Sequence, residues 1–210
     1  MYTLSTPQSS PHFTRLFPKI YRYRLLLWLI APLFLNSCGY NQMVGKEEAV
    51  GAQWANVETA YQRRADLIPN LVSTVKGYAN FEQETLLGVV EARSKATGVQ
   101  VNADKLDEAS IQKFQESQAA LSGALSRLLV VVEKYPDLKA NQNFLELQSQ
   151  LEGTENRIGV ERRRFNEMVQ DYNAYIRKFP NNLISGMFGF EKKGYFKAEA
   201  GSDKAPKVEF

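Results

Sequence analysis

Residues 141–179 read NQNFLELQSQLEGTENRIGVERRRFNEMVQDYNAYIRKF, and they carry the clearest repeating pattern in the chain. Mostly apolar side chains recur there at alternating steps of three and four residues, which places them on one stripe of an α-helix. The series is Phe144, Leu147, Leu151, Thr154, Ile158, Glu161, Phe165, Met168, Tyr172, Tyr175 and Phe179. The pattern predicts one long helix that packs along this stripe.

Three upstream stretches repeat the same spacing, at residues 50–61, 68–96 and 111–135. Strand-like alternation is absent from the body of the chain. Helices with one apolar stripe each bury it by packing against one another. We therefore expect an all-α fold, an antiparallel up-and-down helical bundle of four segments over residues 43–180.

Glycine, proline and capping residues mark where these helices should end. Gly98 closes the second stretch, and Pro136 stops the third. Asp137 or Asn141 is placed to cap the fourth helix, which Pro180 stops.

Pro69 leaves two topologies open. The stripe passes through it without a phase shift, but proline removes the backbone hydrogen bond to Ala65 and should at least kink a helix. It either separates two bundle helices, which we favour, or bends one long first helix and leaves a three-helix bundle.

The N-terminal region has the layout of a secretory signal peptide. Four basic residues precede the apolar run at residues 25–35, and Leu-Asn-Ser-Cys follows at residues 35–38. Cys38 is the only cysteine, and its position is typical of a bacterial lipobox, in which the thiol is acylated. We predict a signal peptide at residues 1–37 and a lipidated tether at residues 38–42.

An uncleaved membrane anchor and a buried helix are the alternatives for this region. The apolar run is 11 residues long, or about 16 Å of helix, whereas a bilayer core needs about 20 residues. The run is therefore short for a complete span.

Removal of residues 1–37 changes the charge of the protein. The segment holds four of the 26 basic residues and none of the 23 acidic ones, so the formal net charge falls from +3 to −1. A nearly neutral mature chain offers no general attraction for nucleic acid, and we predict none as a partner.

Residues 181–210 differ in character from the bundle. Aromatic residues and methionine alternate there with glycine and lysine, and residues 198–207 have a composition that suggests flexibility. We expect the aromatic side chains to fold back on the open end of the bundle. Docking to a partner or contact with a membrane is the alternative.

The mature chain lacks the side chains of common catalytic centres. His12 is the only histidine and lies in the predicted signal peptide. Catalytic triads, Cys-His pairs, Cys/His zinc sites and Glu-x-x-His di-metal motifs all require residues that are missing. We predict no catalytic residues, no metal and no cofactor.

Polar residues on the apolar stripes form the candidate site, a polar core or pocket made of Glu82, Glu161, Arg157 and Arg162. Gln118 and Thr154 are further polar residues on these stripes. An unpaired buried carboxylate would cost several kcal/mol, so basic partners are expected. Such residues either pair and fix the register of the helices or line a ligand pocket.

The run Arg162-Arg163-Arg164 also has two interpretations. Charged runs on helices are usually solvated faces supported by partners one turn away, such as Glu167. The alternative is contact with a phosphate or a lipid headgroup.

Four motifs occur in order along the chain: RRADLIPNLV at residues 63–72, TVKGYA at 74–79, YPDLKAN at 135–141 and LEGTENRI at 151–158. With these motifs the chain resembles the LemA family over roughly residues 40–196. The resemblance implies an antiparallel helical bundle held at a membrane by its N-terminus, with no established enzymatic activity. Many members have an N-terminal membrane helix where this chain has Cys38.

These observations predict a non-enzymatic lipoprotein of the bacterial cell envelope. A lipid on Cys38 would hold it to the membrane, with the bundle outside the cytoplasm and facing the periplasm. The bundle would act as an adaptor or scaffold for another envelope protein. The alternative function is a ligand- or metal-binding bundle that uses the buried carboxylates Glu82 and Glu161.

Overall fold

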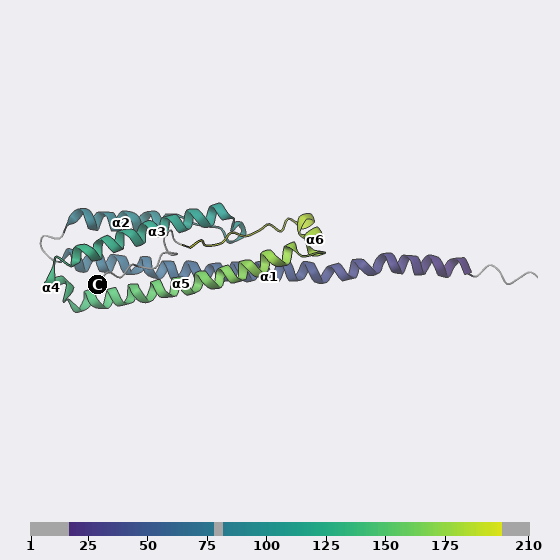
Figure 1. The fold of residues 1–210 in the computed structure, drawn as a ribbon, viewed down its shortest axis with the longest axis horizontal. Helices are drawn as coiled ribbons and strands as arrows, with labels where there is room; N and C mark the ends of the chain where they lie inside the picture. The colour runs from purple at the N-terminus through teal and green to yellow at the C-terminus, as the bar shows by residue number, and fades with distance from the viewer. Residues whose placement is uncertain (1–16, 78–81, 199–210) are drawn as a thin grey trace, which may run out of the picture.

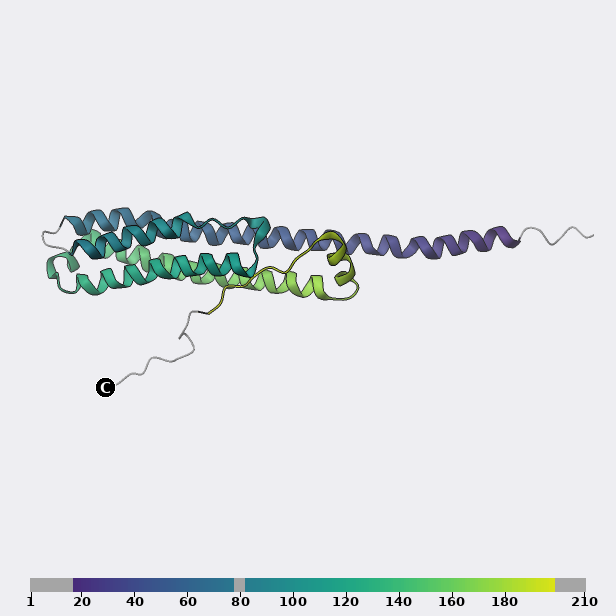
Figure 2. The ribbon, with the colours of Figure 1, turned by 90° about the horizontal axis from the view of Figure 1, so that it is seen from above.

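Four long helices form the body of the protein and run alternately up and down (Figures 1 and 2). They are α1 (Phe17–Lys76), α2 (Gln83–Gly98), α3 (Glu108–Val132) and α5 (Gln142–Arg177). The computed structural model describes the backbone of residues 17–77 and 82–198, and side chains from residue 39 onward within those ranges. All regular elements in these ranges are helical, which confirms the predicted all-α bundle.

Three short elements complete the fold. A 3₁₀ turn, η1 (Ala103–Lys105), lies in the loop between α2 and α3. Helix α4 (Pro136–Lys139) joins α3 to α5, and α6 (Asn181–Phe188) follows α5. The Cys38 side chain, residues 1–16 of the predicted signal peptide and residues 199–210 of the predicted tail lie outside the described part.

The helix boundaries follow most of the predicted signals. Asn141 caps α5, because its side chain accepts a hydrogen bond from the Phe144 amide at 3.1 Å. Pro180 follows the end of α5 as predicted. Pro136 begins α4 rather than ending α3, which stops earlier at Val132.

The predicted boundary at Pro69 is wrong, because α1 continues through it. The first helix ends at Lys76 and α2 begins at Gln83. Pro69 cannot supply the amide that would bond to the Ala65 carbonyl. Arg93 of α2 replaces it, since its Nε donates to that carbonyl at 2.8 Å. A side chain from the neighbouring helix thus compensates for the proline.

Arg93→Met should therefore lower the free energy of unfolding by about 1–3 kcal/mol, the usual cost of a buried acceptor left without a donor. In a Pro69→Ala background the backbone amide returns, and the same change should cost less than half as much. Chemical denaturation of the four proteins of this cycle measures the coupling. Equal costs in both backgrounds would contradict the compensation.

The apolar core consists of two clusters along the bundle axis. One surrounds Trp54 and Tyr61, both buried as expected, and includes Phe114 and Phe165. The other begins at Ile68 and continues toward the α4 end. Between Tyr61 and Ile68, α1 places the buried Arg64 at the junction of the clusters.

Candidate functional site

Glu161 is a buried carboxylate whose exposed fraction is 4%. Gln53 of α1 donates to it at 2.9 Å, and Arg157 and Arg164 each approach it at 3.5 Å from neighbouring turns of α5. The expected pairing of Glu161 with Arg157 is present. The carboxylate is thus fully engaged by side chains of two helices, which fixes how α1 and α5 align.

Glu82 does not belong to this polar core, contrary to the prediction. It is the N-cap residue of α2, near the α4 end of the bundle, and its exposed carboxylate pairs with Lys134 at 3.2 Å. The prediction that Glu82 lies on a helix stripe is wrong because α2 begins only at Gln83, so Glu82 lies just outside the helix.

The described contacts of Arg162 are with the C-terminal segment. Its guanidinium carbon lies 5.0 Å from the centre of the Phe196 ring, and its Nη2 donates to the Lys197 carbonyl at 3.0 Å. Arg164 approaches Glu161, while Arg163 is exposed. The described contacts of Arg162 and Arg164 are therefore with different parts of the molecule, the C-terminal segment and Glu161 respectively.

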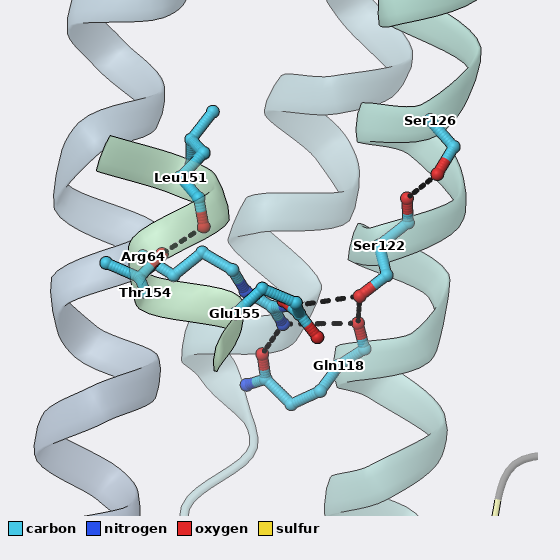
Figure 3. A network of polar contacts seen from close by, with 7 residues as sticks. All are labelled: Arg64, Gln118, Ser122, Ser126, Leu151, Thr154 and Glu155. Carbon is cyan, nitrogen blue, oxygen red and sulfur yellow. Dashed lines mark hydrogen bonds and ion pairs between the residues drawn. The ribbon is translucent and has the colours of Figure 1, made fainter. Parts of the chain in front are cut away.

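A second polar network, centred on Arg64, joins all four long helices. Figure 3 shows the part of it formed by residues of α1, α3 and α5. The guanidinium at its centre donates to Glu155 of α5 at 2.7 Å, and to Gln118 Oε1 and Ser122 Oγ of α3 at 2.8 and 2.9 Å. Gln118 in turn donates to the Ala96 carbonyl of α2 at 3.2 Å. Arg64 itself comes from α1 and is 2% exposed.

The sequence carried a signal for Arg64 that the prediction did not use. Arg64 occupies a stripe position, three residues after Tyr61 and four before Ile68. A charged residue at such a position must find buried partners. Gln118, a polar residue on the stripe of α3, is that partner.

Neither network resembles a metal centre. Among the residues with described side chains, no group of three or more histidine, cysteine, aspartate or glutamate residues is placed to hold an ion. Glu161 has an amide and two guanidinium groups around it, and Glu82 lies elsewhere. The geometry therefore does not bring together the carboxylates that a metal-binding bundle would use.

The extended segment at residues 191–198 forms the third notable feature, because side-chain amides hold its backbone. The Asn173 side chain of α5 donates to the Lys193 carbonyl and accepts from the Lys193 amide. Asn166 of α5 makes the same pair of hydrogen bonds with the backbone of Phe196, and all four distances are 2.9–3.0 Å. Gln115 of α3 does the same for Lys197 at 2.9 and 3.1 Å. Asn166 and Asn173 are seven residues apart, so they share one face of α5.

Two side chains of this segment enter the bundle. Phe196 is 5% exposed and stacks on Trp54, with ring centroids 5.9 Å apart. Lys193 is 7% exposed and pairs with Glu47 of α1 at 2.6 Å. The prediction that the C-terminal aromatic residues fold back on the bundle is confirmed for Phe196.

The Tyr172 hydroxyl also contacts this segment and donates to the Glu191 carbonyl at 3.0 Å. Burial raises the pKa of this hydroxyl well above its ordinary range, and the nearby carboxylates of Glu47 and Glu191 raise it further. Burial and the neighbouring carboxylates therefore favour the neutral form of Tyr172, which donates this hydrogen bond.

Gly194 allows the segment to approach α3. A Cβ atom there would lie 2.7 Å from the Glu108 Cα and 2.8 Å from its amide nitrogen, both backbone atoms that cannot rotate away. Gly194→Ala should displace the segment and lower the free energy of unfolding by about 1–3 kcal/mol. Limited proteolysis at the lysines of the segment should accelerate. Gly186→Ala, where a Cβ meets no atom, is the matched control.

Cys38 lies on the turn of α1 that passes α6. A Cβ at its neighbour Gly39 would lie 3.0 Å from Asn181 Oδ1 and 3.6 Å from Ile184 Cδ1. The predicted lipid attachment point therefore adjoins the α6 end of the bundle. In the part of the chain that the structure describes, no helix is both long and apolar enough to cross a bilayer.

Comparison with known proteins gives a consistent set of relatives. The magnetosome protein MamQ 2 of Paramagnetospirillum magneticum (strain AMB-1) is 25% identical over 183 residues, which cover 78% of this chain and 66% of MamQ 2. MamQ of Magnetospirillum gryphiswaldense (strain MSR-1) is 25% identical over 195 residues, or 85% of this chain and 72% of that protein. Protein LemA of Metamycoplasma hominis (strain PG21) is 25% identical over 158 residues, or 75% of this chain and 68% of that protein.

The chain thus spans just under two thirds of the length of MamQ 2, at 66%. The sequence profile of the LemA family matches residues 53–210, which include all four motifs and the residues of both polar networks. The chain belongs to the LemA family.

Proposed function

We propose that this protein is a membrane-anchored, non-enzymatic scaffold of the bacterial cell envelope. A lipid on Cys38 holds the bundle at the membrane surface, outside the cytoplasm, and the bundle presents its surfaces to another envelope protein. In this arrangement the anchor lies at one end of the molecule, and the bundle projects away from it as a rigid body.

The continuity of α1 carries this proposal. From Cys38, the proposed lipidation point, α1 runs without interruption through the bundle to Lys76. From residue 39 to its end it extends about 57 Å at 1.5 Å per residue. A helix that passes without interruption from the anchor into a packed core transmits position and orientation, which a flexible tether would not.

The inventory of side chains supports a role without catalysis. His12 is the only histidine and Cys38 the only cysteine, and both lie at or before the predicted lipidation point. The buried ionic groups Glu161 and Arg64 are each held by partners from other helices. Groups paired in this way set the register of helices, whereas catalytic groups are held ready for a substrate.

Cys38→Ser tests the anchor. The parent protein should incorporate a clickable palmitate analogue and remain with the membranes after a carbonate wash. The variant should incorporate none and move to the soluble fraction, with its helical circular dichroism unchanged. A variant that stays with the membranes after the wash would contradict the lipid anchor.

A further inference from the structure

The α6 end of the bundle carries an unusual concentration of exposed apolar side chains. Among the described residues, the five most exposed large apolar side chains are Phe179 and Met187 at 81%, Val130 at 69%, Phe188 at 61% and Leu183 at 60%. All except Val130 lie within residues 179–188. A cluster of this kind on a folded protein marks a surface that is covered in the working state.

We propose that this cluster, formed by Phe179, Leu183, Met187 and Phe188, inserts into the interfacial region of the lipid bilayer that carries the anchor. The proposal rests on the proposed function, since it requires the chain to be held at a membrane. It assigns α6 a role as a second contact that fixes the bundle against the bilayer.

The first reason is the position of α6. It lies at the end of the bundle from which α1 extends, as both views show (Figures 1 and 2). The Tyr40 ring of α1 packs on Phe188 and Phe190, with centroids 5.0 and 5.6 Å apart. Acyl chains attached at Cys38 would therefore emerge within two residues of a side chain that touches α6.

The second reason is that α6 is fixed to the bundle by its other side. Ser185 is buried and donates to the Ile176 carbonyl at 3.1 Å, and Ile184 is half-buried against the core. Leu183 and Met187 are four residues apart, so they share one helix face. The hydrogen bond of Ser185 thus fixes one side of α6 to the bundle, and the apolar side chains of Leu183 and Met187 remain exposed to solvent.

The third reason is the charge around the cluster. Arg177 and Lys178 precede it and Lys192 follows it, all of them exposed, against a single acidic residue, Glu191, in residues 177–192. Basic residues beside apolar ones are the usual composition of segments that lie on anionic lipid surfaces. This composition favours a bilayer over a protein groove as the occupant.

A fluorescent depth probe tests the proposal. The lipidated full chain carrying Met187→Cys is labelled with the environment-sensitive dye NBD and reconstituted into phosphatidylethanolamine–phosphatidylglycerol vesicles. Val130→Cys is the matched control, because Val130 is also largely exposed, at 69% against 81% for Met187, but lies near the α4 end. Spin-labelled lipids should quench the probe at position 187 by about half and leave position 130 nearly unchanged, as expected for insertion at the headgroup boundary.

The outcomes separate the two levels of the proposal. Two readouts report the anchor at Cys38 independently of the probe. The anchored protein floats with the vesicles, and the dye does not label the parent chain because its only thiol is acylated. A protein that floats while its two probe positions show equal quenching would overturn the α6 contact and leave the anchor intact. A probe at position 187 that is shielded in cells but not in lipid vesicles would also overturn it, because it would assign the surface to a protein.

Discussion

Arg64→Ala should lower the free energy of unfolding by about 3 kcal/mol, which corresponds to a fall in Tm of about 10 °C. The change removes a nearly completely buried guanidinium that bonds to Glu155, Gln118 and Ser122. It leaves a cavity between the two apolar clusters and buried polar groups without their donor. Thermal and urea denaturation followed by circular dichroism measure the loss.

Two further variants test why Arg64 matters. Glu155 is 54% exposed, so Glu155→Gln should cost less than about 1 kcal/mol, as for other solvated ion pairs. Arg64 also buries its Nε without an acceptor among the described residues. Arg64→Met combined with Gln118→Leu should therefore recover much of the lost stability. A loss below about 1 kcal/mol for Arg64→Ala would contradict a structural role for the network.

Phe196→Ala should also cost about 3 kcal/mol, within the range for truncating a buried phenylalanine. The ring fills a space among Trp54, Phe114 and Phe165, with centroid distances of 5.5–6.5 Å. Without it, residues 191–198 lose their only buried aromatic anchor. The amides of Lys193, Phe196 and Lys197, which bond to side chains of α3 and α5, should then exchange hydrogen faster.

Tyr195→Ala is the matched control for Phe196→Ala. Tyr195 is the neighbouring residue of the same segment, but its side chain is 39% exposed. Its truncation should leave hydrogen exchange at Lys193 and Phe196 unchanged. Equal effects of the two variants would contradict the role of Phe196 as the residue that anchors the segment.

Periodicity predicted the helices because it reports which side chains share a face. The series from Phe144 to Tyr175 lies in one helix, α5, and its members Phe144, Ile158, Phe165 and Tyr172 are buried. The cap at Asn141 was predictable for a similar reason, since capping is a local interaction. These features depend on residues close together in the sequence.

The remaining features depend on contacts between distant residues, which local patterns do not report. The boundary predicted at Pro69 is wrong because the Arg93 side chain that donates to the Ala65 carbonyl comes from another helix. The partners of Arg64 are 54 to 91 residues away in the sequence, at Gln118, Ser122 and Glu155. The amide contacts of Asn166 and Asn173 with the C-terminal segment are of the same kind.

In-cell crosslinking of the tagged full chain, followed by capture from detergent and mass spectrometry, measures whether the anchored bundle is a scaffold. The result we predict is one envelope protein that is recovered from the parent strain in an amount nearly equal to that of the tagged protein itself. The same partner should be lost from the Cys38→Ser strain. Recovery of no enriched partner, or equal recovery from both strains, would contradict a scaffold whose action depends on its membrane anchor.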